Sequence, residues 1–204
     1  CGLGDVYKRQ GWHIEVSAMA MKYLGETFDL HCGGVDNIFP HHEDEIAQSE
    51  ACTGHMFVKT WLHCEHLVVD GKKMSKSLGN FFTVRDLLEH GIPGEVIRFV
   101  LLMTHYRSPM DWTAEKARQA EATLRKFYSL ASEALDNEAA HIGVMTALAD
   151  DLNTAQAVHE LHQLAHAGDS PSLRASLRLL GFMDRGIPDW ARSPDVDLAS
   201  QTER

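Results

Sequence analysis

The sequence predicts an α/β fold that gives way near residue 110 to an all-helical region. Two observations support this division. In the first part, short extended segments alternate with helical ones across glycine turns such as Gly33-Gly34 and Asp70-Gly71. From Thr83 onward, apolar residues recur with helical spacing almost to residue 182. Alternating strands and helices are typical of α/β proteins, whereas a continuous series of helical periods is typical of bundles.

The first part is expected to contain a helix over residues 14–24, a strand over 27–31, a helix from Pro40 to about residue 52, and strands over 57–62 and 65–69. Gly25 is expected to end the first helix, because glycine readily adopts the left-handed conformation that follows a helix. Pro40 suits a first helical turn, where its missing N–H group has no partner to lose. The acidic residues 43–45 then lie near the positive end of the helix dipole.

The lysine-rich loop and then the helices follow Asp70-Gly71, the dipeptide of a tight turn between strands. Thr83, with Asp86 three residues later, predicts a capped helix start, and Thr113 predicts another. Helices are expected over residues 84–90, 95–105, 114–135, 142–149, 154–166 and 172–182. The residues after Gly186 are polar and include two prolines, so a frayed tail is expected there.

Composition indicates a soluble globular protein: the chain has 204 residues, of which 44% are hydrophobic and 24% charged. Its four cysteines show no C-x-x-C spacing, and no signal peptide or membrane-spanning run accompanies them. We therefore expect a cytoplasmic protein with free thiols and no membrane contact. The net charge of −10 opposes nucleic-acid binding, although basic segments at residues 72–85 and 118–126 offer a local face for it.

The segment Lys73-Met74-Ser75-Lys76-Ser77 has the chemistry of a phosphate-binding loop. Two ammonium groups three residues apart act as mobile point charges for phosphate oxygens, and the serines and backbone N–H groups add donors. Two lysines alone would more often be a solvated charged loop. The complete segment with its flanking residues favours polyphosphate binding.

A second cluster lies between His31 and Glu45, which includes Gly33-Gly34 and the run Phe39-Pro40-His41-His42-Glu43. On a helix begun by Pro40, His41 and Glu45 are four residues apart and share a face, as two ligands of one metal ion must. The same spacing is also that of an ordinary ion pair on a helix surface. The residues alone leave both interpretations open.

Three motifs, in this order and spacing, resemble the cysteinyl-tRNA synthetases, a family of class I aminoacyl-tRNA synthetases. They are Gly11-Trp12-His13-Ile14-Glu15, the run from Gly33 to Glu45, and the lysine loop at residues 73–77. The likeness extends from about residue 11 to residue 182. It implies a Rossmann-like class I catalytic domain followed by an α-helical bundle domain.

The resemblance implies ATP-dependent ligation of L-cysteine to its cognate tRNA, tRNA(Cys), through a cysteinyl adenylate. ATP with Mg²⁺ would be a substrate, zinc a cofactor, and the enzyme a monomer. The family's other phosphate-binding element, His-Ile-Gly-His, has no true match, because His141-Ile142-Gly143-Val144 lacks the last histidine and follows the lysine loop. We therefore expect a fragment that lacks the N-terminal half of the catalytic domain and is inactive alone.

Family members hold zinc with two cysteines, a histidine and a glutamate, and the metal binds the substrate thiol. The matching positions here are His41 and Glu45. The chain departs from the pattern at Val16, where the family has a cysteine ligand, and the other cysteine belongs to a strand outside this chain. A two-ligand site would hold zinc poorly, unless Cys32 substitutes for the missing ligand.

The resemblance suggests roles for further residues. Lys73 and Lys76 would be catalytic and, with Ser75, Gly33 and Gly34, would bind ATP. Trp12, His31 and Asp36 would contact the amino acid or the adenylate. The plain alternatives are a core aromatic residue, a hydrogen-bonded histidine and a turn carboxylate.

The expected domains are a junction segment that is not native at residues 1–10, a partial catalytic domain at 11–110, a helical tRNA-stem-binding domain at 111–185 and a flexible tail at 186–204. Two other functions stay open. One is the related ligase of mycothiol biosynthesis, which passes activated cysteine to an amino sugar. The other is a non-catalytic paralogue that binds tRNA or nucleotide, for which Val16 is the best support.

Overall fold

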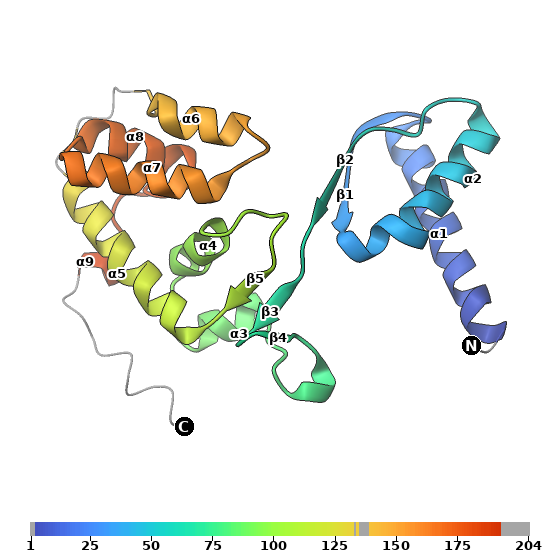
Figure 1. Cartoon of the computed structure of the whole chain (residues 1–204), viewed down its shortest axis with the longest axis horizontal. Coiled ribbons are helices and arrows are strands. Elements are labelled where there is room, and N and C mark those ends of the chain that lie inside the picture. The colour runs from blue at the N-terminus through green and yellow to red at the C-terminus, as the bar shows by residue number, and fades with distance from the viewer. Residues whose placement is uncertain (1–2, 133, 135–138, 193–204) are drawn as a thin grey trace. The chain divides into compact units, whose positions relative to one another are not determined.

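The structure is a computed structural model that describes residues 3–132, 134 and 139–192 (Figure 1). It forms two compact units, residues 1–66 and 67–204, and each is described by itself. In this described part of the chain, no helix is both long enough and apolar enough to cross a membrane.

The first unit contains α1 (Leu3–Leu24), β1 (Phe28–Gly34), a 3₁₀ turn (Val35–Asn37), a wide π-type turn (Ile38–His42), α2 (Glu43–Thr53) and β2 (Val58–Cys64). Strands β1 and β2 pair in parallel, with His31 opposite Trp61. Helix α2, which connects the two strands, packs against α1. This strand–helix–strand order is typical of α/β folds.

The first helix starts earlier than expected, because α1 begins at Leu3, well before residue 14. The expected helix start at Pro40 agrees with the backbone. Within Ile38–His42, Phe39 is the residue with non-helical angles (φ −134°, ψ 131°), as steric contact with a following proline ring favours. The helical backbone therefore starts at Pro40 and continues through His42 into α2.

The interior of the first unit is mostly polar. Among its described side chains, the buried hydrophobic ones are Phe57 and Val58. The buried polar ones are His13, Ser17, His41, His42, Glu45 and Ser49. Buried polar groups need partners, so the contacts of these side chains decide what this unit can do.

The second unit contains a small sheet with the order β4-β3-β5, made of β3 (Leu67–Val69), β4 (Lys72–Lys73) and β5 (Met110–Trp112). β3 pairs antiparallel with β4 and parallel with β5. Asp70 and Gly71 join β3 to β4 with φ values of 49° and 71°. Positive φ at both central residues is the geometry of a type I′ hairpin turn, which confirms the turn predicted from this dipeptide.

The helices of the second unit are α3 (Val84–Glu89), α4 (Gly94–Leu102), α5 (Ala114–Ala131), α6 (Ile142–Ala149), α7 (Thr154–Ala167), α8 (Ser170–Leu179) and α9 (Asp189–Arg192). Thr83 and Asp86 form the predicted capping box, and Thr113 caps α5. Helix α7 packs against both α6 and α8, and α8 also packs on α5 (Figure 1). One apolar core joins these helices, with Leu124, Leu161 and Leu177 fully buried.

The last described segment packs onto this core. Trp190 on α9 contacts the Tyr128 ring edge to face, with ring centroids 5.9 Å apart, and its Nε1–H donates to Glu95 at 3.3 Å. Ile187 and Ala191 pack against the same core. These residues belong to the segment expected as a flexible tail, and the rest of that segment lies outside the described residues. The expected domain boundary near residue 110 stays a prediction, since the compact units divide at residue 66.

Candidate functional site

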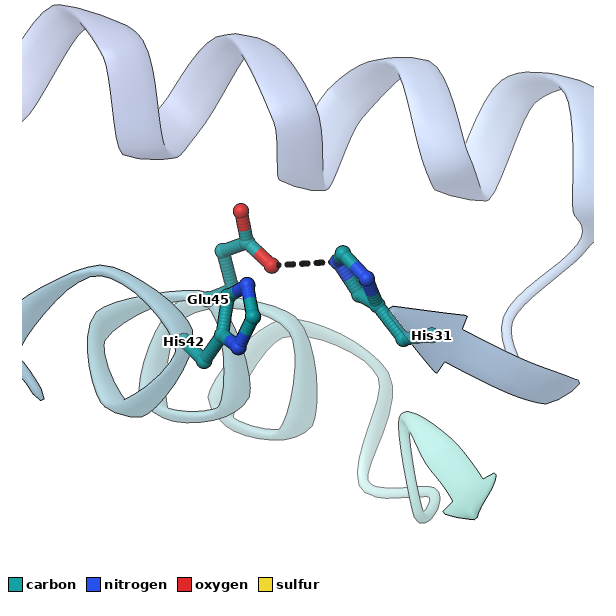
Figure 2. A group of neighbouring side chains, drawn as sticks. All are labelled: His31, His42 and Glu45. Atoms are coloured by element: carbon teal, nitrogen blue, oxygen red, sulfur yellow. Dashed lines mark hydrogen bonds and ion pairs between the residues drawn. The ribbon is translucent and has the colours of Figure 1, made fainter. Parts of the chain in front are cut away.

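Histidines from four elements of the first unit surround the carboxylate of Glu45. His13 comes from α1, His31 from β1, His41 and His42 from the turn before α2, and His63 from β2. Figure 2 shows His31, His42 and Glu45 pointing toward one another from the strand and from the start of the helix. The parallel pairing of β1 and β2 and the docking of α2 bring these distant positions together.

Glu45 is completely buried, and its two carboxylate oxygens differ in their hydrogen bonding. Oε2 lies 2.8 Å from Nε2 of His31 in a hydrogen bond. Oε1 lies 2.9 Å from Nε2 of His41, but it has no hydrogen-bond partner with acceptable alignment. Burial raises the pKa of this carboxyl, and the neighbouring His31 opposes that rise. A buried carboxylate oxygen without a hydrogen bond is costly, and a bound cation would remove that cost.

His41 is enclosed by aromatic rings. Its ring stacks on Trp12 with centroids 3.7 Å apart, and its Nδ1 lies 2.6 Å from Nδ1 of His13. One of these two nitrogens must be the donor and the other the acceptor. Burial lowers the pKa of His41, and the neighbouring His13 and His31 lower it further. The surroundings therefore favour the neutral imidazole, although the nearby Asp44 acts in the opposite direction.

His42 is equally buried, and its Nδ1 lies 2.8 Å from Nε2 of His63. Burial, followed by the charges of His31, His63 and His41, lowers the pKa of His42 to about 4. Gly33 makes room for the ring, because a Cβ atom there would lie 2.6 Å from Cε1 of His42. The glycine is thus required by packing, since its φ lies outside the positive range.

This site fits a divalent metal ion such as zinc. One ligand atom from each of His31, His42 and Glu45 lies within 4.8 Å of the others. Neutral imidazole and carboxylate are the forms that bind zinc, and burial favours the neutral form of His42 by lowering its pKa. His41 reaches Glu45 with its Nε2, so the predicted closeness of these two residues is confirmed. Their role as the family's metal ligands stays a prediction.

Neither of the two positions considered for a cysteine ligand, Val16 and Cys32, contributes a ligand atom to the cluster. Val16 is half-buried on α1 and offers no ligand atom. Cys32 is exposed and does not belong to the metal-capable group among the described residues. Successive side chains of a strand point to opposite faces, and His31 on β1 points into the cluster. The alternative in which Cys32 replaces a missing ligand therefore has no support.

Two of the predicted substrate residues, Trp12 and His31, belong to this cluster, whereas Asp36 contacts His66 after β2. Trp12 is 48% exposed and forms one wall through its stack on His41. His31 stacks on Trp61 with ring centroids 4.7 Å apart. Asp36 is exposed on the 3₁₀ turn, 4.0 Å from Nε2 of His66, and Gly34 leaves space for its carboxylate. Their roles toward substrate stay predictions.

The lysine loop is held closed by Asn80. The Ser75 N–H group donates to Oδ1 of Asn80 at 2.9 Å, and Nδ2 of Asn80 donates to the carbonyl of Lys73 at 3.2 Å. The Ser75 and Ser77 hydroxyls lie 3.2 Å apart, and Gly79 has a φ of 68°. Lys73 is exposed and available to an anion. The loop is therefore built around an asparagine that the sequence did not single out.

Sequence reasoning also missed the roles of His13, His42 and His63. For His13 there was a local signal, because Ser17 follows it by four residues and both are buried on one face of α1. His42 and His63 gave no such signal. Their contact spans 21 residues and depends on the position of β2 beside β1.

Comparison with known proteins defines the class of protein. The family model described as "tRNA synthetases class I (C) catalytic domain" matches residues 6–122. This match covers more than half of the 204 residues, and the chain belongs to this family. The predicted resemblance to class I synthetases is confirmed. The match begins within the segment expected to be non-native, and that expectation stays untested.

Individual relatives carry more specific names than the family model. Cysteine–tRNA ligases of Paracoccus denitrificans, Roseobacter denitrificans and Ruegeria pomeroyi are 58%, 61% and 55% identical over 200, 192 and 197 residues. The alignments cover 96%, 92% and 93% of this chain but only 42%, 40% and 42% of the relatives. The chain thus spans about two fifths of the length of these relatives.

A solved structure supports the fold. LeuRS of Agrobacterium radiobacter, in a ternary complex with tRNA and LeuAMS, matches with a TM-score of 0.57 over 75% of this chain and 24% of that chain. The sequences are only 18% identical, so this likeness concerns the fold alone. It agrees with the α/β class I catalytic fold predicted from the sequence.

Proposed function

We propose that the protein to which these residues belong ligates L-cysteine to tRNA(Cys), using ATP with Mg²⁺ and passing through a cysteinyl adenylate. The observation that carries the proposal is the identity of 54–61% to proteins named cysteine–tRNA ligase. None of those relatives is named as a mycothiol-pathway ligase, which favours tRNA as the acceptor.

In this proposal the lysine loop supplies positive charge to the triphosphate. Lys73 and Lys76 stabilise the charge that develops on the phosphate oxygens as the cysteine carboxylate attacks the α-phosphate. Such electrostatic stabilisation needs no covalent nucleophile from the protein. Ser75, Gly33 and Gly34 contribute to ATP binding, and the closed shape of the loop holds its charges in place before the substrate arrives.

The histidine cluster selects the amino acid. Zinc, when bound at Glu45 with the family's histidine His41, would supply a preference for a thiolate over a hydroxyl. Trp12 forms the wall of the pocket, and His31 and Asp36 contact the amino acid or the adenylate. Because cysteine and serine differ by one atom, pocket shape alone would discriminate weakly between them.

The helices after residue 110 form a bundle domain at residues 111–185 that binds a stem of the tRNA. We further propose a cytoplasmic, monomeric enzyme. The 204 residues alone should give only background activity, since they contain no complete His-Ile-Gly-His element. In the structure, His141 instead caps α6 by accepting from the Gly143 N–H group, a local role unrelated to phosphate.

ATP–pyrophosphate exchange with the full-length gene product tests the function. Exchange should depend on cysteine and exceed that with serine, and Lys73→Ala should lower its rate by about 100-fold. Lys59→Ala is the matched control, because Lys59 is an exposed lysine paired with the exposed Asp29. Equal exchange with serine, or retained tRNA binding without any exchange, would contradict the proposal. The second result would favour a non-catalytic paralogue.

A further inference from the structure

We infer that Asp111, the central residue of β5, is a positioning residue for the lysine loop, because it fixes the turn from which the loop begins. The inference rests on the proposed function, in which Lys73 supplies positive charge to ATP. Across the small sheet, Asp111 lies opposite Val68 of β3, and Val68 lies opposite Lys73 of β4. The three residues form one row whose ends are about 10 Å apart, which is twice the spacing of neighbouring strands.

The contact that Asp111 makes lies at the turn between β3 and β4. The Gly71 N–H group donates to Oδ1 of Asp111 at 3.0 Å, and the Asp70 N–H group donates to the carbonyl of Trp112 at 3.2 Å. Two successive residues of β5 thus hold two successive residues of the turn. The hydrogen bond to the carboxylate is of the charge-assisted kind, which is stronger than one between neutral groups. Because β4 follows this turn directly and ends at Lys73, the turn sets where the lysine loop begins.

Asp111 is itself held by its surroundings. Its neighbours along the strand, Met110 and Trp112, are buried in the apolar core of the second unit. Its backbone carbonyl accepts a hydrogen bond from Nζ of Lys116, in the first turn of α5, at 2.8 Å. A side chain can position another group only when its own location is fixed by packing and hydrogen bonds, and Asp111 meets this condition.

The chain that leaves the lysine loop returns to the same strand. The ring of Phe82 packs edge to face against the ring of Trp112, with ring centroids 6.1 Å apart. The loop therefore begins at a turn that Asp111 holds and is followed by a ring that packs on the next residue of β5. Both ends of the loop are thus attached to β5, so a change at Asp111 should displace the lysines without unfolding the core.

The charge of Asp111 favours a positioning role over a binding role. A carboxylate repels the phosphate groups of ATP, so direct contact between Asp111 and the substrate would oppose binding. Its Oδ1 atom is instead engaged with a backbone N–H group. An asparagine has the same shape and offers the same acceptor without the negative charge. Asp111→Asn therefore keeps the contact with the turn, whereas Asp111→Ala removes it.

The kinetics of ATP–pyrophosphate exchange by the full-length gene product test the inference. Asp111→Ala should lower kcat about tenfold, because displaced charges stabilise the transition state less well. The KM for cysteine should stay unchanged, because the residues proposed to bind cysteine belong to the first unit. Asp111→Asn should stay within about threefold of the unsubstituted protein, because it keeps the acceptor. Glu89→Ala, in an exposed carboxylate paired with Arg85 on α3, is the matched control and should have no effect.

A double-mutant cycle with Lys73→Ala separates positioning from general damage to the fold. If Asp111 acts through Lys73, the loss caused by Asp111→Ala should shrink to about threefold or less once that lysine is absent. A loss of stability would instead lower the fraction of active protein by the same factor in both backgrounds. Equal losses in the two backgrounds would therefore overturn the inference, and so would full activity of Asp111→Ala.

Amide hydrogen exchange of the same proteins, measured without substrates, gives a readout that does not depend on activity. Asp111→Ala should speed exchange at residues 70–73 by at least about tenfold and leave α5 unchanged, as the loss of a hydrogen bond to a charged group implies. Unchanged exchange at these residues would also overturn the inference. Failure of the proposed function would look different, because the unsubstituted protein would then show no cysteine-dependent pyrophosphate exchange.

Discussion

The two compact units are stabilised in opposite ways. The interior of the second unit is apolar and joins α4, α5, α7 and α8 around residues such as Leu124 and Leu161. The interior of the first unit is a cluster of imidazoles around the carboxylate of Glu45, with few buried hydrophobic side chains among its described residues. Buried apolar area stabilises a fold by itself, but a buried polar cluster does so only when every group has a partner.

The difference teaches where function and stability lie in this chain. In the second unit the interior holds the fold together, and the lysine loop lies on its surface. In the first unit the interior is the candidate site. If the proposed zinc binds in this interior, the stability of the first unit should depend on the bound ion.

The largest effect should come from a cavity in the second unit. Leu124→Ala removes a fully buried side chain from α5 and should lower the free energy of unfolding by about 2–5 kcal/mol, measured by urea denaturation. Leu101→Ala, in a half-exposed leucine on α4, is the control and should cost less than about 1 kcal/mol. Zinc affinity should stay unchanged in both variants. Equal losses of unfolding free energy in the two variants would contradict the view that the buried apolar core stabilises the second unit.

The next effect is stabilisation of the first unit by metal. Zinc at 100 times its dissociation constant should stabilise the binding form by about 2.7 kcal/mol, equivalent to about 100-fold slower amide exchange. Hydrogen exchange with mass spectrometry should show this slowing in β1 and α2 but not in α5. Glu45→Gln should abolish the slowing. Equal slowing of amide exchange in both units would contradict the expectation that the metal stabilises the first unit alone.

A third prediction concerns the cost of the buried carboxylate. Without metal, Glu45→Met should leave the free energy of unfolding unchanged or raise it by about 1 kcal/mol or more, because a packed apolar side chain replaces a desolvated charge. Thermal denaturation in the presence of a chelator measures this change. Glu43→Met, in an exposed residue of the same helix, should shift stability by no more than about 0.5 kcal/mol. A clear loss of stability in Glu45→Met would show that the carboxylate supports the metal-free fold.

The smallest effect concerns the capping box of α3. Thr83→Ala should lower the free energy of unfolding by about 1 kcal/mol at pH 7, measured by urea denaturation. Hydrogen bonds from Thr83 lower the pKa of Asp86 below its ordinary value of 3.8. Since the folded pKa lies below the unfolded one, the contribution of Asp86 is complete above the unfolded value and is lost as the pH falls through the folded value. Asp86→Asn should therefore destabilise the protein at pH 7 and have no effect in strong acid.

Local signals in the sequence predicted local structure well. Thr83 and Asp86 form the expected capping box, Asp70-Gly71 forms the expected turn, and His41 reaches Glu45 across one helical turn. The extended Phe39 is followed by helical backbone from Pro40 onward, as a proline in a first helical turn predicts. In each case the deciding interactions lie within a few residues.

The centre of the site could not be predicted because its contacts are distant in sequence. His31 meets Glu45 across 14 residues, and His13 meets His41 across 28. These contacts depend on how α2 docks on α1 and on the two strands, which no local pattern specifies. The packing of Trp190 beside Tyr128 depends on the same kind of distant contact.

Asn80 has a consequence for how the lysine loop can move. One amide group bridges the carbonyl of Lys73 and the N–H group of Ser75, so the intervening residues form a small closed ring. Gly79 lies inside the segment that Asn80 closes, and its left-handed φ of 68° lets the chain return to the asparagine. The backbone of the loop is thus ordered in advance, and an approaching anion meets a preformed surface.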